Sequence, residues 1–316
     1  MRSALKSKKN TFLGKFVFTV FFRKTHMNAL NLIFFVNIRI NLYLCSMKEI
    51  VSHIVSELKD FYPPEEVQEL AYWIIEETTG ITRTQIYMGH PQKTIPNLPN
   101  VLEQLQQHTP IQYIFGHTQW MGLDLCVDSS TLIPRPETAE LVDWITSSCD
   151  NKASLQVLDI GTGSGCIAIA LKRKCPNWQV QGVDISAEAL SIAKENGERN
   201  NVQVSWQQMD ILAEKPDLKD IIVSNPPYIC HKEKSQMDER VLAHEPHTAL
   251  FVPDSDPLLF YRRIASMKSA KSLYFEINEA YGDEVCAMMK TLGYSDVTLK
   301  YDMYGKPRMV FGRIKA

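Results

Sequence analysis

A glycine-rich turn between two apolar segments constrains the fold of this chain most strongly. The run Leu155–Ile160 is almost continuously apolar, as in a strand buried on both faces of a parallel sheet. It is followed by Gly161-Thr162-Gly163-Ser164-Gly165 and then by the apolar segment Cys166–Leu171. Glycine lets the backbone approach a ligand closely, and a helix N-terminus attracts electron-rich groups. The sequence therefore predicts a strand, a ligand-binding turn and a helix of an α/β domain.

The residues after the next two strands indicate a nucleoside cofactor. A dinucleotide fingerprint has Gly or Ala where this chain has Cys166, so the tight turn favours a nucleoside without a pyrophosphate. The second strand ends in Asp184, whose carboxylate is placed to accept hydrogen bonds from both ribose hydroxyls. Asp210 and Ile211 follow the third strand, where the acid can bind an adenine amino group and the apolar side chain can cover the ring.

The tetrapeptide Asn225-Pro226-Pro227-Tyr228 follows a fourth apolar run, 220–224. Ligands of open α/β sheets bind at the carboxyl ends of the strands, so we expect the tetrapeptide at the same edge as the glycine turn. Consecutive prolines fix φ and lack N–H groups, which leaves carbonyl oxygens and the Asn225 amide to face a ligand. Such a loop accepts hydrogen bonds from an N–H2 group, although taken alone it also fits an ordinary proline-rich turn.

The remaining segments predict a small helical region and the other elements of the α/β domain. Helix signals lie from Met47, from Pro63-Pro64 to Gly80, near 82–88 and near 98–107. Apolar and polar residues alternate around two glycines over Ile111–Asp128, which predicts a β-hairpin there. Further helices are expected at 139–147, 187–200, 256–267 and 282–292, and further strands at 179–183, 202–206, 273–277, 297–301 and 308–314. Counting gives seven strands in a sheet that is parallel except for its last strand.

These elements divide the chain into four parts. Residues 1–46 are a basic and apolar extension, 47–110 a helical domain for substrate recognition, 111–136 a β-hairpin and linker, and 137–316 the catalytic domain. The apolar runs of the extension are shorter than a membrane span, and no small-residue site follows as in a signal peptide. We favour a third interpretation, in which translation starts at Met47.

The linker contains a proline-rich elbow, Leu132–Thr138. Arg135 lies between two of its prolines and is either a surface charge or a residue that lines the site. Glu137 and Thr138 are expected to cap the helix that follows.

Charge and cysteine content disfavour several classes of partner and site. The extension holds eight Lys/Arg and no acid, which leaves 26 basic and 36 acidic residues from Met47 on, a net charge of −10. Nonspecific binding of duplex nucleic acid requires a surplus of basic residues. Seven scattered cysteines without a C-x-x-C pair predict reduced thiols in a cytosolic protein. His244 and His247 have no third ligand at a suitable spacing, so no metal site is predicted.

Taken together, the motifs resemble the peptide chain release factor N5-glutamine methyltransferase family over nearly everything from Met47 on. The matching segments are Gln112-Tyr113-Ile114-x-Gly116, Leu132-Ile133-Pro134-Arg135-Pro136-Glu137-Thr138, Asp159-x-Gly161-Thr162-Gly163-Ser164-Gly165, Val223-Ser224-Asn225-Pro226-Pro227-Tyr228-Ile229 and Glu245-Pro246-x-x-Ala249-Leu250. Three positions depart from the family pattern: Ala139, Ile211 and the segment Phe275-Glu276-Ile277-Asn278.

The resemblance implies a class I methyltransferase fold, S-adenosylmethionine as the methyl donor, and release factors as partners. The acceptor is then the side-chain amide of the glutamine in a Gly-Gly-Gln loop. Asn225 and Pro226 are expected to accept the two amide N–H groups, with Tyr228 packed against the glutamine and Pro227 completing the substrate site. The cofactor site is expected to comprise Gly161, Thr162, Gly163, Ser164, Gly165, Asp184, Asp210, Ile211 and Asn225. We expect a cytoplasmic monomer that binds neither nucleic acid directly nor a membrane.

Two alternatives belong to other functional classes. An adenine-N6 methyltransferase of nucleic acids would also use an Asn-Pro-Pro-Tyr loop, with the base stacked on Tyr228. The acidic body and the lack of an evident target-recognition domain argue against it. A cofactor-binding scaffold without turnover is disfavoured by the intact set of cofactor acids beside the acceptor loop.

Overall fold

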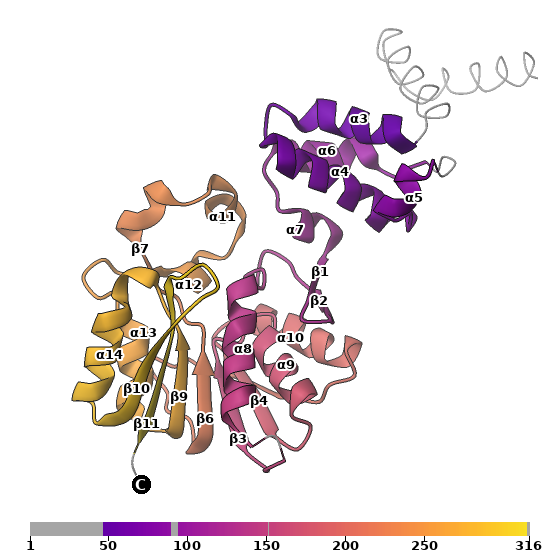
Figure 1. Ribbon diagram of the computed structural model, residues 1–316. Coiled ribbons are helices and arrows are strands. Elements are labelled where there is room, and N and C mark those ends of the chain that lie inside the picture. The colour runs from indigo at the N-terminus through magenta and orange to yellow at the C-terminus, as the bar shows by residue number, and fades with distance from the viewer. Residues whose placement is uncertain (1–46, 90–93, 151, 315–316) are drawn as a thin grey trace, which may run out of the picture. The chain divides into compact units, whose positions relative to one another are not determined.

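The computed structural model describes residues 47–89, 94–150 and 152–314 (Figure 1). The predictions for residues 1–46, including a start at Met47, lie outside the described residues. The chain divides into two compact units, with the boundary between Leu102 and Glu103.

The first unit contains the predicted helices. They are α3 (Met47–Leu58), α4 (Pro64–Thr79) and α5 (Arg83–Tyr87), and α6 (Leu98–Gln106) crosses the unit boundary. Ile50, Ile54 and Leu58 recur on one face of α3 and are buried, as an amphipathic helix requires. Gly80 ends α4 in the left-handed conformation at φ 69°, and a capping box of Thr82 and Gln85 starts α5.

The stretch predicted as one hairpin begins instead with a helix. Helix α7 (Ile111–Phe115) starts after Pro110 and ends at Gly116, where φ is 75°. Only the remainder is a hairpin, formed by β1 (His117–Trp120) and β2 (Leu123–Cys126). The prediction was wrong for the first five residues because so short an apolar segment does not distinguish a helical turn from a strand.

Seven strands form the large sheet of the second unit, in the order β10-β11-β9-β6-β3-β4-β5. Their bounds are β3 (Gln156–Ile160), β4 (Gln179–Asp184), β5 (Ser205–Gln208), β6 (Lys219–Ser224), β9 (Ala270–Glu276), β10 (Tyr294–Tyr301) and β11 (Pro307–Ile314). Strand β11 runs antiparallel to both of its neighbours, and the other pairs are parallel. The predicted seven-stranded, mostly parallel sheet is therefore confirmed.

Helices cover both faces of this sheet (Figure 1). They are α8 (Pro136–Ser148), α9 (Cys166–Lys174), α10 (Ala187–Arg199), α13 (Leu259–Met267) and α14 (Gly282–Thr291). One core cluster joins α8 and α9 to strand residues such as Val157 and Val223, and a second joins α13 and α14 to Leu158 and Ile222. Neighbouring strand residues thus point to opposite faces, and both faces are buried.

Some elements differ from the prediction. Strand β5 starts at Ser205 rather than Val202, because the Val202 N–H donates to Gly197 O and completes the end of α10. Four short elements follow β6 where a polar loop or helix was expected: β7 (Ile229–Cys230), the 3₁₀ helix η1 (His231–Gln236), α11 (Glu239–His244) and α12 (His247–Leu250). Strand β8 (Phe251–Val252) pairs in parallel with β7. A second 3₁₀ helix, η2 (Glu279–Tyr281), precedes α14.

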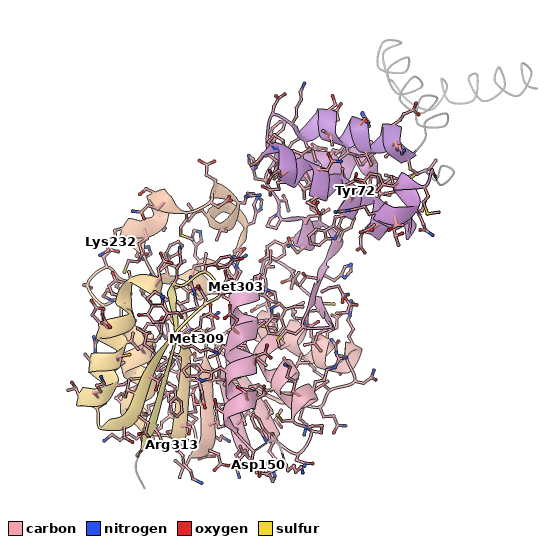
Figure 2. The ribbon with its side chains drawn as sticks, in the orientation of Figure 1. Tyr72, Asp150, Lys232, Met303, Met309 and Arg313 are labelled. Carbon is pink, nitrogen blue, oxygen red and sulfur yellow. The ribbon has the colours of Figure 1, made fainter. Side chains whose placement is uncertain are left out.

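The carboxyl ends of the parallel strands meet at one edge of the large sheet. The turn between β10 and β11 lies at the same edge, since Figure 2 shows Met303 at the end of the sheet opposite to Asp150 and Arg313.

We predict that Gly182→Ala destabilises the second unit by about 1–3 kcal/mol, because a Cβ there would lie 2.4 Å from the Trp206 ring. The free energy of unfolding from urea titration measures the loss. Trp206→Leu in the same chain should recover part of it. If the losses in free energy of unfolding of the two single variants simply add in the double variant, contact with the Trp206 ring is not the cause of the destabilisation.

Candidate active site

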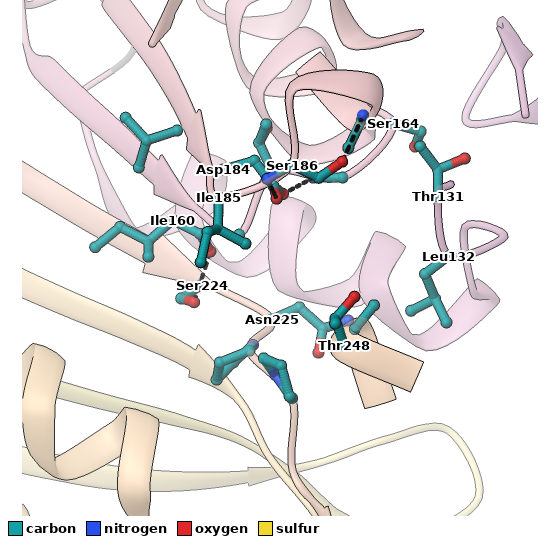
Figure 3. Close-up of a pocket in the computed structure, with 18 of the residues that line it drawn as sticks. Thr131, Leu132, Ile160, Ser164, Asp184, Ile185, Ser186, Ser224, Asn225 and Thr248 are labelled. Carbon is teal, nitrogen blue, oxygen red and sulfur yellow. Dashed lines mark hydrogen bonds between the residues drawn. The ribbon is translucent and has the colours of Figure 1, made fainter. Parts of the chain in front are cut away.

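A cavity of about 370 Å³ lies at the carboxyl edge of the large sheet (Figure 3). Its walls come from the glycine turn after β3, the ends of β4 and β6, the elbow before α8, and α12. The cavity brings together ten of the predicted site residues: Gly161, Thr162, Gly163, Ser164, Asp184, Asp210, Ile211, Asn225, Pro226 and Pro227. Gly165 and Tyr228 do not line it.

The glycine turn forms the wall above β3. Gly161 and Gly163 adopt φ values of 70° and 54°, which a residue with a side chain rarely does. The Thr162 hydroxyl donates to Asp159 at 2.6 Å and fixes the turn, while burial raises the pKa of Asp159 to about 7. Ser164 is buried, and within the described residues its hydroxyl has no hydrogen-bond partner.

Gly165 has a packing role instead of a place in the cavity wall. It precedes α9 at φ 80°, and a Cβ on it would lie 2.8 Å from the Trp206 ring. The lack of a Cβ thus lets the helix start against this ring.

Asp184 ends β4 and is held by backbone donors. Its two carboxylate oxygens accept hydrogen bonds from the Gly163 N–H at 2.9 Å and from the Ser186 N–H at 3.0 Å. Figure 3 shows this pair of bonds on the wall that Asp184 forms. Each carboxylate oxygen has a second lone pair. The side chain can therefore also accept bonds from two hydroxyl groups of a ligand.

An apolar slot adjoins Asp210 and Ile211. Met209 and Ile211 are buried, whereas Ile185 and Leu212 line the cavity with 58% and 41% of their surface exposed. Apolar side chains that are exposed to the cavity in this way can pack against the faces of a flat aromatic ligand. Sequence reasoning missed Ile185 and Leu212, although each directly follows a predicted site residue.

Asn225 and the two prolines form a separate wall (Figure 3). The side-chain N–H2 of Asn225 donates to Thr138 Oγ1 at 3.4 Å. Thr138 itself donates to Glu276 at 2.7 Å and makes no side-chain capping bond to α8, so the predicted cap at this position was wrong. The reason is that α8 already begins at Pro136 with Arg135 as its N-cap, which places Thr138 inside the first turn instead of ahead of the helix.

Tyr228 packs against the second core cluster, and its N–H donates to Leu250 O. Burial raises the pKa of its hydroxyl, which interacts with Glu276. Its predicted contact with a substrate side chain stays a prediction.

Arg135 joins the elbow to the segment that carries α12. Its guanidinium donates to both carboxylate oxygens of Glu245 at 2.7 Å, and the Glu245 side chain is only 2% exposed. Trp120 donates its ring N–H to the backbone oxygen of Arg135 at 2.9 Å. Because Arg135 also lines the cavity with Thr248 and Ala249 of α12, the ion pair holds two parts of the wall together.

The described residues contain no group of three or more side chains that could hold a metal ion. His244 lies 3.1 Å from Gln107 O, and His247 lies 2.9 Å from Leu242 O. Six cysteines in the described part of the chain are free thiols, and Cys45 lies outside it. Among the helices of these same residues, none has the length and apolarity to cross a membrane.

Known proteins resemble this chain over most of its length. Residues 49–116 match the family model of the PrmC N-terminal domain, and residues 140–250 match that of the methyltransferase small domain. A protein of Bacteroides thetaiotaomicron named release factor glutamine methyltransferase is 44% identical over 279 residues, which cover 84% of this chain and 99% of that protein. A protein of Flavobacterium psychrophilum with the same name is 40% identical over 280 residues, covering 84% and 98%.

Among solved structures, the hMettl16 catalytic domain in complex with a MAT2A 3′UTR hairpin is similar in fold. The TM-score is 0.52 at 14% identity, over 70% of this chain and 94% of that one. At this identity the likeness concerns the fold alone. With the family models, it confirms the predicted class I methyltransferase fold.

We predict that Arg135→Met lowers the free energy of unfolding by about 1–3 kcal/mol, because it leaves the buried Glu245 carboxylate without its cation. Arg135→Lys should recover only part of the loss, since it restores a cation but its ammonium reaches less far than the guanidinium nitrogen that contacts both Glu245 oxygens. The exposed pair Lys174–Asp143 provides the control. Lys174→Met should cost less than about 1 kcal/mol, and an equal cost for both pairs in urea titration would contradict this role of Arg135.

Proposed function

This chain belongs to the release factor glutamine methyltransferase family, and on that premise we propose that it methylates the side-chain amide nitrogen, N5, of the glutamine in the Gly-Gly-Gln loop of a release factor. The observation that carries the proposal is the cavity wall of Asn225, Pro226 and Pro227, which shares one cavity with the glycine turn and Asp184. That arrangement combines a wall of hydrogen-bond acceptors with a nucleoside site.

The residues of the cavity fit S-adenosylmethionine as the methyl donor. Asp184 has lone pairs left for the ribose hydroxyls, and the apolar slot beside Asp210 suits adenine. When bound, this cofactor supplies a methyl group on a positively charged sulfur, which is already a strong electrophile.

The remaining task of the protein is to activate the acceptor. An amide nitrogen is a poor nucleophile because its lone pair is delocalised into the carbonyl group. We propose that Asn225 Oδ1 and the Pro226 carbonyl oxygen each accept one N–H of the glutamine amide. Transfer of the methyl group to this nitrogen would place positive charge on it, until one of its two N–H protons passes to solvent water. Acceptors fixed in advance stabilise that charge.

Geometry is the leading contribution to catalysis in this proposal. Well-oriented placement of two reactants lowers a barrier by up to about 7–11 kcal/mol. Two consecutive prolines keep the acceptor wall rigid, and no strong base is needed. The helical domain 47–110 is proposed to recognise the release factor, and the protein is proposed to act as a monomer. The adenine-N6 alternative is not favoured, since the relatives at 40–44% identity are named for a glutamine acceptor.

We predict that Asn225→Ala lowers kcat by about 10²- to 10³-fold, as expected for loss of one group that stabilises charge in the transition state. Binding of S-adenosylmethionine, measured by isothermal titration, should remain largely intact. Asp184→Ala is the matched control, since it should weaken cofactor binding directly. Wild-type turnover by Asn225→Ala would remove Asn225 from the reaction.

A second experiment tests the acceptor. Radiolabelled methyl transfer from S-adenosylmethionine is measured with a purified bacterial release factor and with the same factor carrying Ala in place of the acceptor glutamine. We expect label in the first factor and none in the second, nor in DNA or RNA. Equal labelling of both factors, or labelling of nucleic acid alone, would overturn the proposed acceptor.

A further inference from the structure

We propose that Thr138 and Glu276 form a positioning relay that determines which end of the Asn225 carboxamide faces the acceptor. The inference rests on the proposed function of Asn225. It assigns a role to two side chains that do not themselves contact the reacting atoms.

The relay is built from three elements that are distant in sequence. Asn225 follows β6, Thr138 lies in the first turn of α8, and Glu276 is the last residue of β9. The Asn225 N–H2 donates to Thr138 Oγ1 at 3.4 Å, and the Thr138 hydroxyl donates to Glu276 Oε2 at 2.7 Å. Thr138 and Glu276 are 2% and 1% exposed, so water competes little with these bonds.

The direction of the hydrogen bonds follows from the chemistry of the last group. An ionised carboxylate only accepts, so the single hydroxyl proton of Thr138 is directed at Glu276. The Thr138 oxygen is then left as an acceptor, and only the N–H2 end of the Asn225 carboxamide can donate to it. The Oδ1 end must therefore point away from Thr138. Among the described residues, no donor binds this oxygen, which leaves it available for an amide N–H of the substrate.

The charge state of Glu276 thus controls the relay. Burial raises the pKa of its carboxyl to about 7, while Thr138, Arg308 and Tyr228 favour the ionised form. A protonated Glu276 can donate to Thr138, whose own proton is then free to bond Asn225 Oδ1. The Asn225 carboxamide is then no longer held in one orientation. In a fraction of the protein molecules its Oδ1 no longer faces the substrate amide.

Several other ionisable groups face Glu276 from the surrounding elements. They are Glu137 of α8, Cys166 of α9, Tyr228 after β6, Tyr261 of α13 and Arg308 of β11. Arg308 is held in turn by Asp302 at 3.1 Å and by Glu279 at 3.5 Å. Asp159 below the glycine turn also has a pKa of about 7, so its titration must be separated from that of Glu276.

The test compares two substitutions of Thr138. Thr138→Val keeps the volume and removes the acceptor oxygen, and Thr138→Ser keeps the oxygen. We expect kcat for release factor methylation to fall about tenfold in Thr138→Val, the equivalent of one neutral hydrogen bond. Thr138→Ser should restore most of it, and the dissociation constant of S-adenosylmethionine should stay within about twofold in both, because the relay leaves the cofactor contacts unchanged.

Thr146→Val is the matched control, because Thr146 is a buried threonine of the same helix whose hydroxyl bonds Val142 O. It should leave kcat unchanged. Equal kcat in Thr138→Ser and Thr138→Val, or a parallel loss of cofactor affinity, would show a packing role and overturn the relay. Unchanged kcat in Thr138→Val would overturn it too. The proposed function survives these results as long as Asn225→Ala still lowers kcat by about 10²- to 10³-fold.

The pH profile supplies a readout that packing does not move. In the wild type, kcat should decrease as the pH falls through about 7, because protonation of Glu276 releases Asn225. In Glu276→Gln, kcat should be lower than the wild-type maximum and should not decrease as the pH falls. The reason is that the Gln amide can direct either an oxygen or an N–H at Thr138. Asp159 is retained in Glu276→Gln. If the pH dependence of kcat is lost in this variant, that dependence therefore arises from Glu276. A wild-type pH profile in Glu276→Gln would contradict the relay.

Discussion

Parallel pairing of β3 with β4 and β6 is the constraint on which the site depends. Ile160 pairs with Val183 on one side and with Ser224 on the other, and the Ser224 hydroxyl donates to Ile160 O at 2.7 Å. The next residue of each strand therefore belongs to the cavity wall: Gly161, Asp184 and Asn225. A shift of register in any of these strands would separate the acceptor wall from the nucleoside site.

The same edge of the sheet contains polar side chains that an apolar core normally excludes. Asp159, Thr162, Thr138 and Glu276 are all buried. Burying a polar group costs free energy unless it is hydrogen-bonded, and here each hydroxyl donates to one of the two acids. The two pairs have matching roles, since one fixes the glycine turn and the other reaches Asn225. The fold thus uses buried acid–hydroxyl pairs to hold both walls of the cavity.

Contiguous motifs explain how much could be predicted from the sequence. The glycine turn, Asp184 and Asn225 each follow a recognisable strand, and parallel strands must end at a common edge. Helix α7 and the pair β7–β8 were missed because two to five residues show no periodicity. The partners Thr138 and Glu276 could not be predicted, because they are 138 positions apart and only the packing of α8 against β9 brings them together.

The central claim is geometric: Asn225 and Pro226 together hold the two N–H groups of a glutamine amide. A crystal structure with S-adenosylhomocysteine and a peptide containing Gly-Gly-Gln measures this directly. We predict that the amide nitrogen lies about 2.7–3.2 Å from both Asn225 Oδ1 and the Pro226 carbonyl oxygen. A glutamine bound in the cavity with its amide nitrogen beyond hydrogen-bond distance of both oxygens would contradict the account.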